Sequence, residues 1–316
     1  DEAKRLGLEI GFNIQSGWNL GGPCVTPQYA AKQLTYSEQK VTGGKTLHLQ
    51  LAEPEVHKGF YKDIVVLAFP SNKENETDEL VSNLDLKLGF HELGGSAPDC
   101  RFLLENNARG REKKPDKTIY LVDMARIVDL TGQMDEKGLL SWDAPEGDGN
   151  IMRIGYTCTQ SEVSTSSRDW QGNVLDYMDR SAFDYYWNTI VKPILQAAGE
   201  KHVGSTLKFM ETDSWECGGM NWTDAFADEF RSYCGYDLKQ YLPLIAGHVV
   251  NNIDTSNAFL ADFRKTIAHL VATNHYARFA EHAHQHNMGI QPESAGPHAG
   301  PLDGMKNYGL SDIVMS

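Results

Sequence analysis

The sequence has few cysteines and lacks the cysteine patterns of a stapled or metal-bound domain. Five cysteines occur in 316 residues, and none belongs to a CxxC pair. An odd, scattered set predicts neither a disulfide framework nor a zinc site. Whether Cys217 and Cys234 form a disulfide is left undecided, because their spacing in the sequence alone does not show it.

Long apolar runs and an excess of positive charge are also missing. No apolar run approaches the roughly 20 residues that a transmembrane helix needs. The 29 Lys and Arg are outnumbered by 43 Asp and Glu, which gives a net charge of −14. An acidic surface repels phosphate backbones, so we expect no nucleic-acid partner. The 41% apolar and 23% charged residues are typical of a globular protein.

The acidic stretch after residue 210 is the strongest chemical signal. Leu207–Met210 has a partly alternating pattern that predicts a strand. Glu211, Asp213 and Glu216 follow within six residues, and a glycine-rich loop comes next. Carboxylates at a strand end beside Trp215 indicate a sugar-cleaving site, but a solvated acidic turn explains the same residues equally well.

The first residues read as a helix end, a strand and a long loop. Residues 1–8 end in a glycine stop, 8–12 form a short strand, and 13–27 are rich in Gly, Pro and polar groups. A helix–glycine–strand step is the repeating unit of a parallel α/β fold. Asn13 and Trp18 in this loop are candidate sugar contacts, since a Trp face stacks on sugar rings. A Trp that closes the loop is the alternative.

The middle of the chain changes to short strands separated by turns. Strands are predicted at 34–41, 45–51, 61–69, 118–122 and 150–156, with an exposed loop at 107–117 and a turn-rich segment at 139–150. Many short strands with turns between them indicate a β-sandwich-like module. We therefore expect an all-β insertion over 33–157, with 1–32 and 158–316 belonging to the α/β domain.

Helical patterns return after the insertion. Helices are predicted at 179–198, with Asp179 as cap, at 223–233, with Thr223 as cap, and at 257–286. Along 179–198 one apolar face is formed by Phe183, Tyr186, Trp187, Ile190 and Ile194. Further strands are expected at 288–293, ending in Glu293, and at 311–315. We expect these two strands to run parallel to 8–12 and 207–212.

Three histidines crowd the end of the last helix. His282 and His286 share a helix face, as a metal-binding pair would, but the HExxH pattern is missing. A solvated helix end, where the helix dipole favours cations, is the better account.

Several motifs in a fixed order resemble the α-L-rhamnosidases of glycoside hydrolase family 106. They are Lys4–Phe12, Ser16–Pro27, Tyr61–Pro70, Arg153–Thr157, Thr212–Glu216, Asn221–Phe226, Gly235–Asp237 and Tyr241–Pro243. The resemblance covers nearly the whole chain. It implies a (β/α)8 TIM-type barrel, incomplete at both ends, with the all-β insertion. Cys24 departs from the family, where a Trp is usual.

The resemblance also implies the chemistry: inverting hydrolysis of terminal α-L-rhamnosides in plant or microbial polysaccharides or glycosides, assisted by calcium. The general acid is then Glu216, whereas the base and part of the calcium site lie beyond Ser316. An inverting glycosidase holds its two carboxyl groups roughly 6.5–9.5 Å apart. Our catalytic candidates are Glu216, Asp213 and Glu293, with Glu293 as base, calcium ligand or substrate anchor. The substrate-binding candidates are Asn13, Trp18, Trp215, Asn221 and His298.

Two alternatives stay open: a carbohydrate-binding barrel without catalysis, and another exo-glycosidase on the same barrel. Both ends of the chain look cut through a fold, so we expect part of a longer protein that is secreted or periplasmic. Residues 1–316 alone are expected not to hydrolyse rhamnosides. The sequence predicts neither the oligomeric state nor the aglycone.

Overall fold

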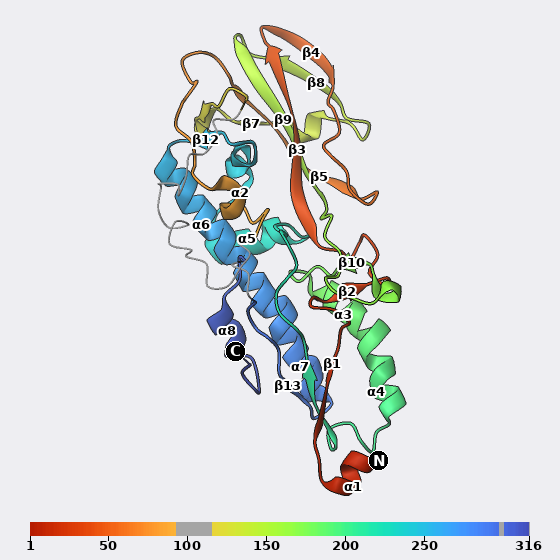
Figure 1. Cartoon of the computed structure of the whole chain (residues 1–316). Coiled ribbons are helices and arrows are strands. Elements are labelled where there is room, and N and C mark those ends of the chain that lie inside the picture. Colours follow the sequence, from red (N-terminus) through yellow and green to blue (C-terminus); the bar gives the residue numbers. More distant parts are fainter. Residues whose placement is uncertain (93–115, 297–299, 316) are drawn as a thin grey trace.

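The computed structural model describes residues 1–92, 116–296 and 300–315. Figure 1 shows an elongated molecule with a strand-rich lobe at one end and a mixed lobe of helices and strands at the other. The small elements at and between the lobes are α1 (Glu2–Leu6), β2 (Gly21–Gly22), α2 (Leu84–Lys87), β6 (Leu121–Val122), η2 (Met124–Arg126), η3 (Thr131–Gln133), η4 (Arg168–Trp170), β10 (Asn173–Val174), β12 (Val249–Val250) and α8 (Gly304–Tyr308).

The mixed lobe contains a parallel sheet whose strands come from distant parts of the sequence. Its order is β1 (Ile10–Asn13), β11 (Leu207–Glu211) and β13 (Gly289–Ile290). Asn13 pairs with Glu211, and Met210 pairs with Ile290. A parallel bridge between Glu293 and Met315 continues the arrangement toward the segment at 311–315. The predicted parallel direction of these four segments is therefore confirmed.

One predicted helix is a composite of three segments. Residues 179–198 form α3 (Arg180–Tyr186), the π-helical η5 (Trp187–Val191) and α4 (Lys192–Ala198). Asp179 caps the start by accepting a hydrogen bond from the Ser181 amide at 2.8 Å, as predicted. The π-helical turn rotates the following residues relative to an ideal α-helix. Ile194 is consequently exposed and does not continue the buried face of Phe183 and Tyr186.

The long C-terminal helix also contains a π-helical stretch. It consists of α6 (Ile253–Leu270), η7 (Val271–Tyr276) and α7 (Ala277–Gln285), and α5 (Phe226–Cys234) and η6 (Lys239–Ala246) precede it in sequence. Figure 1 shows this helix running the length of the mixed lobe. Ala225, not Thr223, occupies the N-cap position of α5, so that predicted cap is wrong. Thr223 is buried, and its side chain hydrogen-bonds Asp176 instead.

The strand-rich lobe has two antiparallel layers. The larger sheet has the order β3 (Lys32–Thr42), β9 (Asp148–Cys158), β5 (Tyr61–Pro70) and β7 (Val128–Asp129). β4 (Lys45–Gln50) pairs with β8 (Leu139–Ala144), which is a strand where a turn-rich segment was predicted. Alternate residues of β5 face opposite sides: Val65 and Leu67 join the main core, whereas Val66 and Ala68 pack in a smaller core with Leu140. This two-layer packing is sandwich-like, as predicted.

A buried ion pair lies where β3 meets the mixed lobe. Lys32 Nζ lies 3.2 Å from Asp176 Oδ2, and both side chains are almost fully buried. Lys32 Nζ also donates to the backbone carbonyls of Gln28 and Ala30. These additional hydrogen bonds offset part of the cost of removing the ammonium group from water.

The structure therefore shows a mixed α/β fold, but the residues it describes form no closed barrel. Cys24, Cys158, Cys217 and Cys234 are all free, so Cys217 and Cys234 are not paired. Cys100 and most of the predicted loop at 107–117 lie outside the described residues. No described helix is long and apolar enough to cross a membrane.

Candidate active site

The carboxyl groups of the candidate site gather where the parallel strands end. Glu211 is the last residue of β11 and pairs with Asn13, the last residue of β1. The Glu293 amide donates to the Thr212 carbonyl at 2.9 Å, which places Glu293 beside the same strand end. Neighbouring parallel strands present their carboxyl ends at one edge, so Asn13, Glu211 and Glu293 share that edge.

These carboxyl groups lie close enough to influence one another. Burial raises the pKa of Glu293, and the charges of Asp213, Glu211 and Glu216 raise it further. Burial also raises the pKa of Glu211, and Asp213 adds to that shift. Like charges held together favour a protonated carboxyl group. The structure thus brings together all three catalytic candidates that the sequence singled out.

Glu216 lies on a loop with tight backbone contacts. The Ser214 amide donates to Asp213 Oδ1 at 2.8 Å, and Ser214 Oγ lies 3.4 Å from Glu216 Oε1. A Cβ on Gly219 would lie only 1.8 Å from the Phe90 carbonyl oxygen, so only glycine fits there. Glu216 itself is half-buried and remains accessible from solvent.

Trp215 is an anchor of this loop rather than a surface for a sugar. Its side chain is fully buried and meets the Tyr177 ring edge-on, with ring centroids 5.2 Å apart. Tyr177 in turn stacks on His275 at 4.0 Å. A Cβ on Gly300 would lie 2.7 Å from Trp215 Nε1. The geometry therefore gives no support to the predicted contact between Trp215 and substrate.

Trp18 is the aromatic candidate that remains accessible. Its side chain is 46% exposed, and its amide donates to the Ser164 carbonyl at 3.0 Å. A Cβ on Gly218 would lie 2.6 Å from Ser161 Oγ. Residues 161–164 therefore contact both the Trp18 loop and the loop of Glu216. The exposed indole of Trp18 is compatible with the predicted sugar-stacking role, which stays a prediction.

The other substrate candidates differ in their surroundings. Asn13 is half-buried, and its Oδ1 accepts a hydrogen bond from the Gln15 amide. Asn221 is fully buried: its Oδ1 accepts from the Leu34 amide, and its Nδ2 donates to the Leu88 carbonyl. Asn221 thus connects three segments, and its predicted contact with substrate stays untested. His298 lies outside the described residues.

Glu92 is a carboxyl group beside the site, and it is not among the residues that the sequence predicted there. Its Oε1 accepts a hydrogen bond from Trp215 Nε1, and the Gly218 amide also donates to this carboxyl group. Burial raises the pKa of Glu92 to about 8 despite these hydrogen bonds, and the charge of Glu216 acts in the same direction. A lone Glu between a short helix and a loop gives no signal in the sequence.

The described residues give no support to a metal centre. No group of three or more His, Cys, Asp or Glu side chains among them is arranged to hold a metal ion. His282 and His286 do share a face, but both rings stack on Trp187, and His282 lies 2.7 Å from Asp184.

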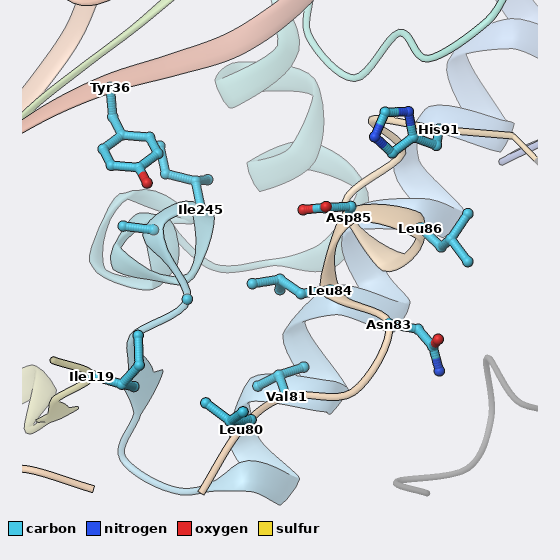
Figure 2. A pocket seen from close by; sticks show the side chains of 12 residues that line it. Tyr36, Leu80, Val81, Asn83, Leu84, Asp85, Leu86, His91, Ile119 and Ile245 are labelled. Atoms are coloured by element: carbon cyan, nitrogen blue, oxygen red, sulfur yellow. The ribbon is translucent and has the colours of Figure 1, made fainter. Parts of the chain in front are cut away.

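A separate cavity of about 520 Å³ lies between the two lobes. Figure 2 shows it between the α2 segment and the chain around Ile245, with Tyr36 at one side and the Leu84 and Asp85 side chains pointing inward. Its lining includes His91 but none of Glu211, Asp213, Glu216 and Glu293. It is therefore distinct from the carboxyl cluster, although His91 directly precedes Glu92.

Paired carboxyl groups at one edge of a sheet are the arrangement by which glycosidases cleave glycosidic bonds. The family model described as alpha-L-rhamnosidase matches residues 1–316. The chain therefore belongs to this family, family 106 of the glycoside hydrolases, as the motifs predicted.

Two relatives extend the comparison. A Formosa agariphila protein with the provisional name of a β-glucuronidase is 37% identical over 317 residues, which are 99% of this chain and 26% of that protein. A solved rhamnosidase from Novosphingobium sp. PP1Y superposes with a TM-score of 0.75 at 22% identity, over 98% of this chain and 41% of that one. This likeness shows a shared fold. The chain spans about a quarter of the length of the curated relative.

Proposed function

We propose that the protein hydrolyses terminal α-L-rhamnosides with inversion, and that Glu216 is the general acid. The observation that carries this proposal is the cluster of carboxyl groups at the end of β11: Glu293 lies beside the strand end through its amide hydrogen bond to Thr212, and Glu216 stands on the loop that follows the strand. Membership of the α-L-rhamnosidase family supports the choice of sugar. We also propose that the parallel sheet is part of a (β/α)8 barrel and that a calcium ion assists the reaction, as the family resemblance implies.

In this reaction Glu216 gives its proton to the glycosidic oxygen as the bond from that oxygen to the anomeric carbon breaks. A water molecule attacks the anomeric carbon from the opposite face and loses its proton to a base. A base works best with a pKa near the working pH. Burial and the neighbouring carboxylates of Asp213 and Glu211 raise the pKa of Glu293, which suits a base. The alternative role of Glu293 is that of a substrate anchor, because the family resemblance places the base elsewhere.

The name of the Formosa agariphila relative raises a second substrate, a β-glucuronide. A glucuronide carries its own carboxylate, whereas rhamnose is an uncharged deoxy sugar. Glu211, Asp213 and Glu293 gather at one strand edge, and their negative charges would repel the carboxylate of a glucuronide. The electrostatics of the described residues therefore favour rhamnose.

The test compares nitrophenyl α-L-rhamnoside with nitrophenyl β-D-glucuronide as substrates of the full-length protein. We expect hydrolysis of the rhamnoside alone, with the β-anomer of rhamnose as the first product by NMR. Hydrolysis of the glucuronide alone would show that the substrate is a β-glucuronide and not an α-L-rhamnoside. Hydrolysis of neither, with saturable binding of rhamnose, would favour the carbohydrate-binding alternative.

A further inference from the structure

The segment that ends in Glu92 lies against the loop that carries Glu216. Asn221 Nδ2 donates to the Leu88 carbonyl at 2.9 Å. The Gly219 backbone lies so close to the Phe90 carbonyl that no Cβ fits between them. Contacts at Leu88 and Phe90 thus bring Glu92 to the acid loop with a defined position.

The carboxyl group of Glu92 contacts this loop on both sides of Glu216. Trp215 Nε1, one residue before Glu216, donates to Glu92 Oε1. The Gly218 amide, two residues after Glu216, donates to the same carboxyl group. One side chain therefore fixes both ends of the four-residue segment 215–218, which contains the proposed acid.

We propose that Glu92 is a positioning residue for the general acid, holding the Glu216 loop by its hydrogen bonds to Trp215 and Gly218. This inference rests on the proposed glycosidase function. A shift of about 1 Å in a catalytic group can cost roughly 100-fold in rate. Without Glu92, the Nε1–H of the buried Trp215 side chain and the half-buried Gly218 amide would lose their acceptor, and the loop would lose its fixed geometry.

Glu92 acts as a neutral group in this arrangement. With a pKa of about 8 it is protonated at neutral pH, so it places no second negative charge beside Glu216 as that residue releases its proton. The Cys217 thiol also faces this region, and burial raises its pKa well above the usual range. Glutamine has an acceptor oxygen and no charge, so Glu92→Gln reproduces the neutral, hydrogen-bond-accepting form of Glu92.

The experiment measures kcat of the full-length protein on an alkyl α-L-rhamnoside, whose leaving group needs protonation, and on a nitrophenyl α-L-rhamnoside, which needs little. We expect Glu92→Ala to lower kcat roughly 100-fold on the alkyl substrate and far less on the nitrophenyl substrate, with KM little changed. Glu92→Gln should retain wild-type behaviour. Trp215→Phe, which removes one donor, should show a weaker form of the same selective loss.

Thermal unfolding and the exposed control Glu79→Ala separate this effect from a general loss of structure. Equal losses of Glu92→Ala on both substrates, or wild-type rates on both, would overturn the inference. If Glu92→Ala does not fold, Glu92→Gln decides: a selective loss with the alkyl substrate would contradict the neutral acceptor role. A wild-type protein that hydrolyses neither substrate would refute the proposed function, and the positioning role with it.

Discussion

At the scale of single residues, burial distinguishes anchors from groups that can meet a substrate. Trp215 and Asn221 are fully buried, whereas Trp18 is 46% exposed and Glu216 is half-buried. The sequence placed all four in the site because each lies in or near a recognisable motif. Motif position does not reveal which way a side chain points, and packing against Tyr177 turns Trp215 inward.

Asn221→Ala tests the structural role of this buried amide. The change leaves the Leu34 amide and the Leu88 carbonyl without their partner, and each buried unsatisfied group costs about 1–3 kcal/mol. We expect the free energy of unfolding to fall by about 2–4 kcal/mol in a denaturant titration. Unchanged stability together with a raised KM for rhamnoside would instead identify Asn221 as a substrate ligand.

At the scale of elements, Glu38 on β3 connects the strand-rich lobe to the chain before β12. His248 Nε2 lies 2.8 Å from Glu38 Oε1, and His248 Nδ1 accepts from the Tyr120 amide, so Nε2 carries the proton. Asn150 on β9 donates to the same carboxylate oxygen. Burial opposes the charge of Glu38, but His248, Lys117 and Asn150 together lower its pKa to about 2.

A lowered pKa in the folded state makes stability depend on pH in one direction. The contribution of Glu38 is present above the ordinary pKa of 4.5 and is lost as the pH falls toward about 2. Between about pH 5 and about pH 2.5 we expect wild type to lose about 2 kcal/mol more stability than Glu38→Gln. Urea unfolding at both pH values measures this, with Glu136→Gln as the exposed control. Parallel losses in wild type and Glu38→Gln would rule out the linkage.

Element type was predicted better than element detail. Periodicity identified the long helices, because burial of one face dominates their pattern. The alternation of helices and strands indicated the parallel strand direction. Periodicity missed the π-helical turns, so Ile194 was placed on the wrong face. It also missed β8, whose partner β4 lies far away in sequence. The pairing of β4 with β8 depends on tertiary contacts that no local sequence pattern encodes. The same is true of the position of Glu92 beside the Glu216 loop.

At the scale of the whole molecule, apolar side chains are exposed along both outer parts of the parallel sheet. They are Leu8 and Ile10 at β1, and Ile313 and Val314 near the bridge to Glu293. Unpaired strand edges with apolar side chains favour association. We expect residues 1–316 expressed alone to elute in light-scattering chromatography with a mass that rises with concentration. A stable monomer at all concentrations would contradict this expectation.

The central claim is that Glu216 protonates the leaving oxygen, and the full-length Glu216→Gln variant tests it most directly. The measurement is kcat on an alkyl α-L-rhamnoside, beside the exposed control Glu136→Gln and with thermal unfolding as a check. Because general acid catalysis contributes roughly 100- to 10,000-fold, we expect a loss in that range with the fold intact. A near-wild-type rate on this poor leaving group would contradict the account.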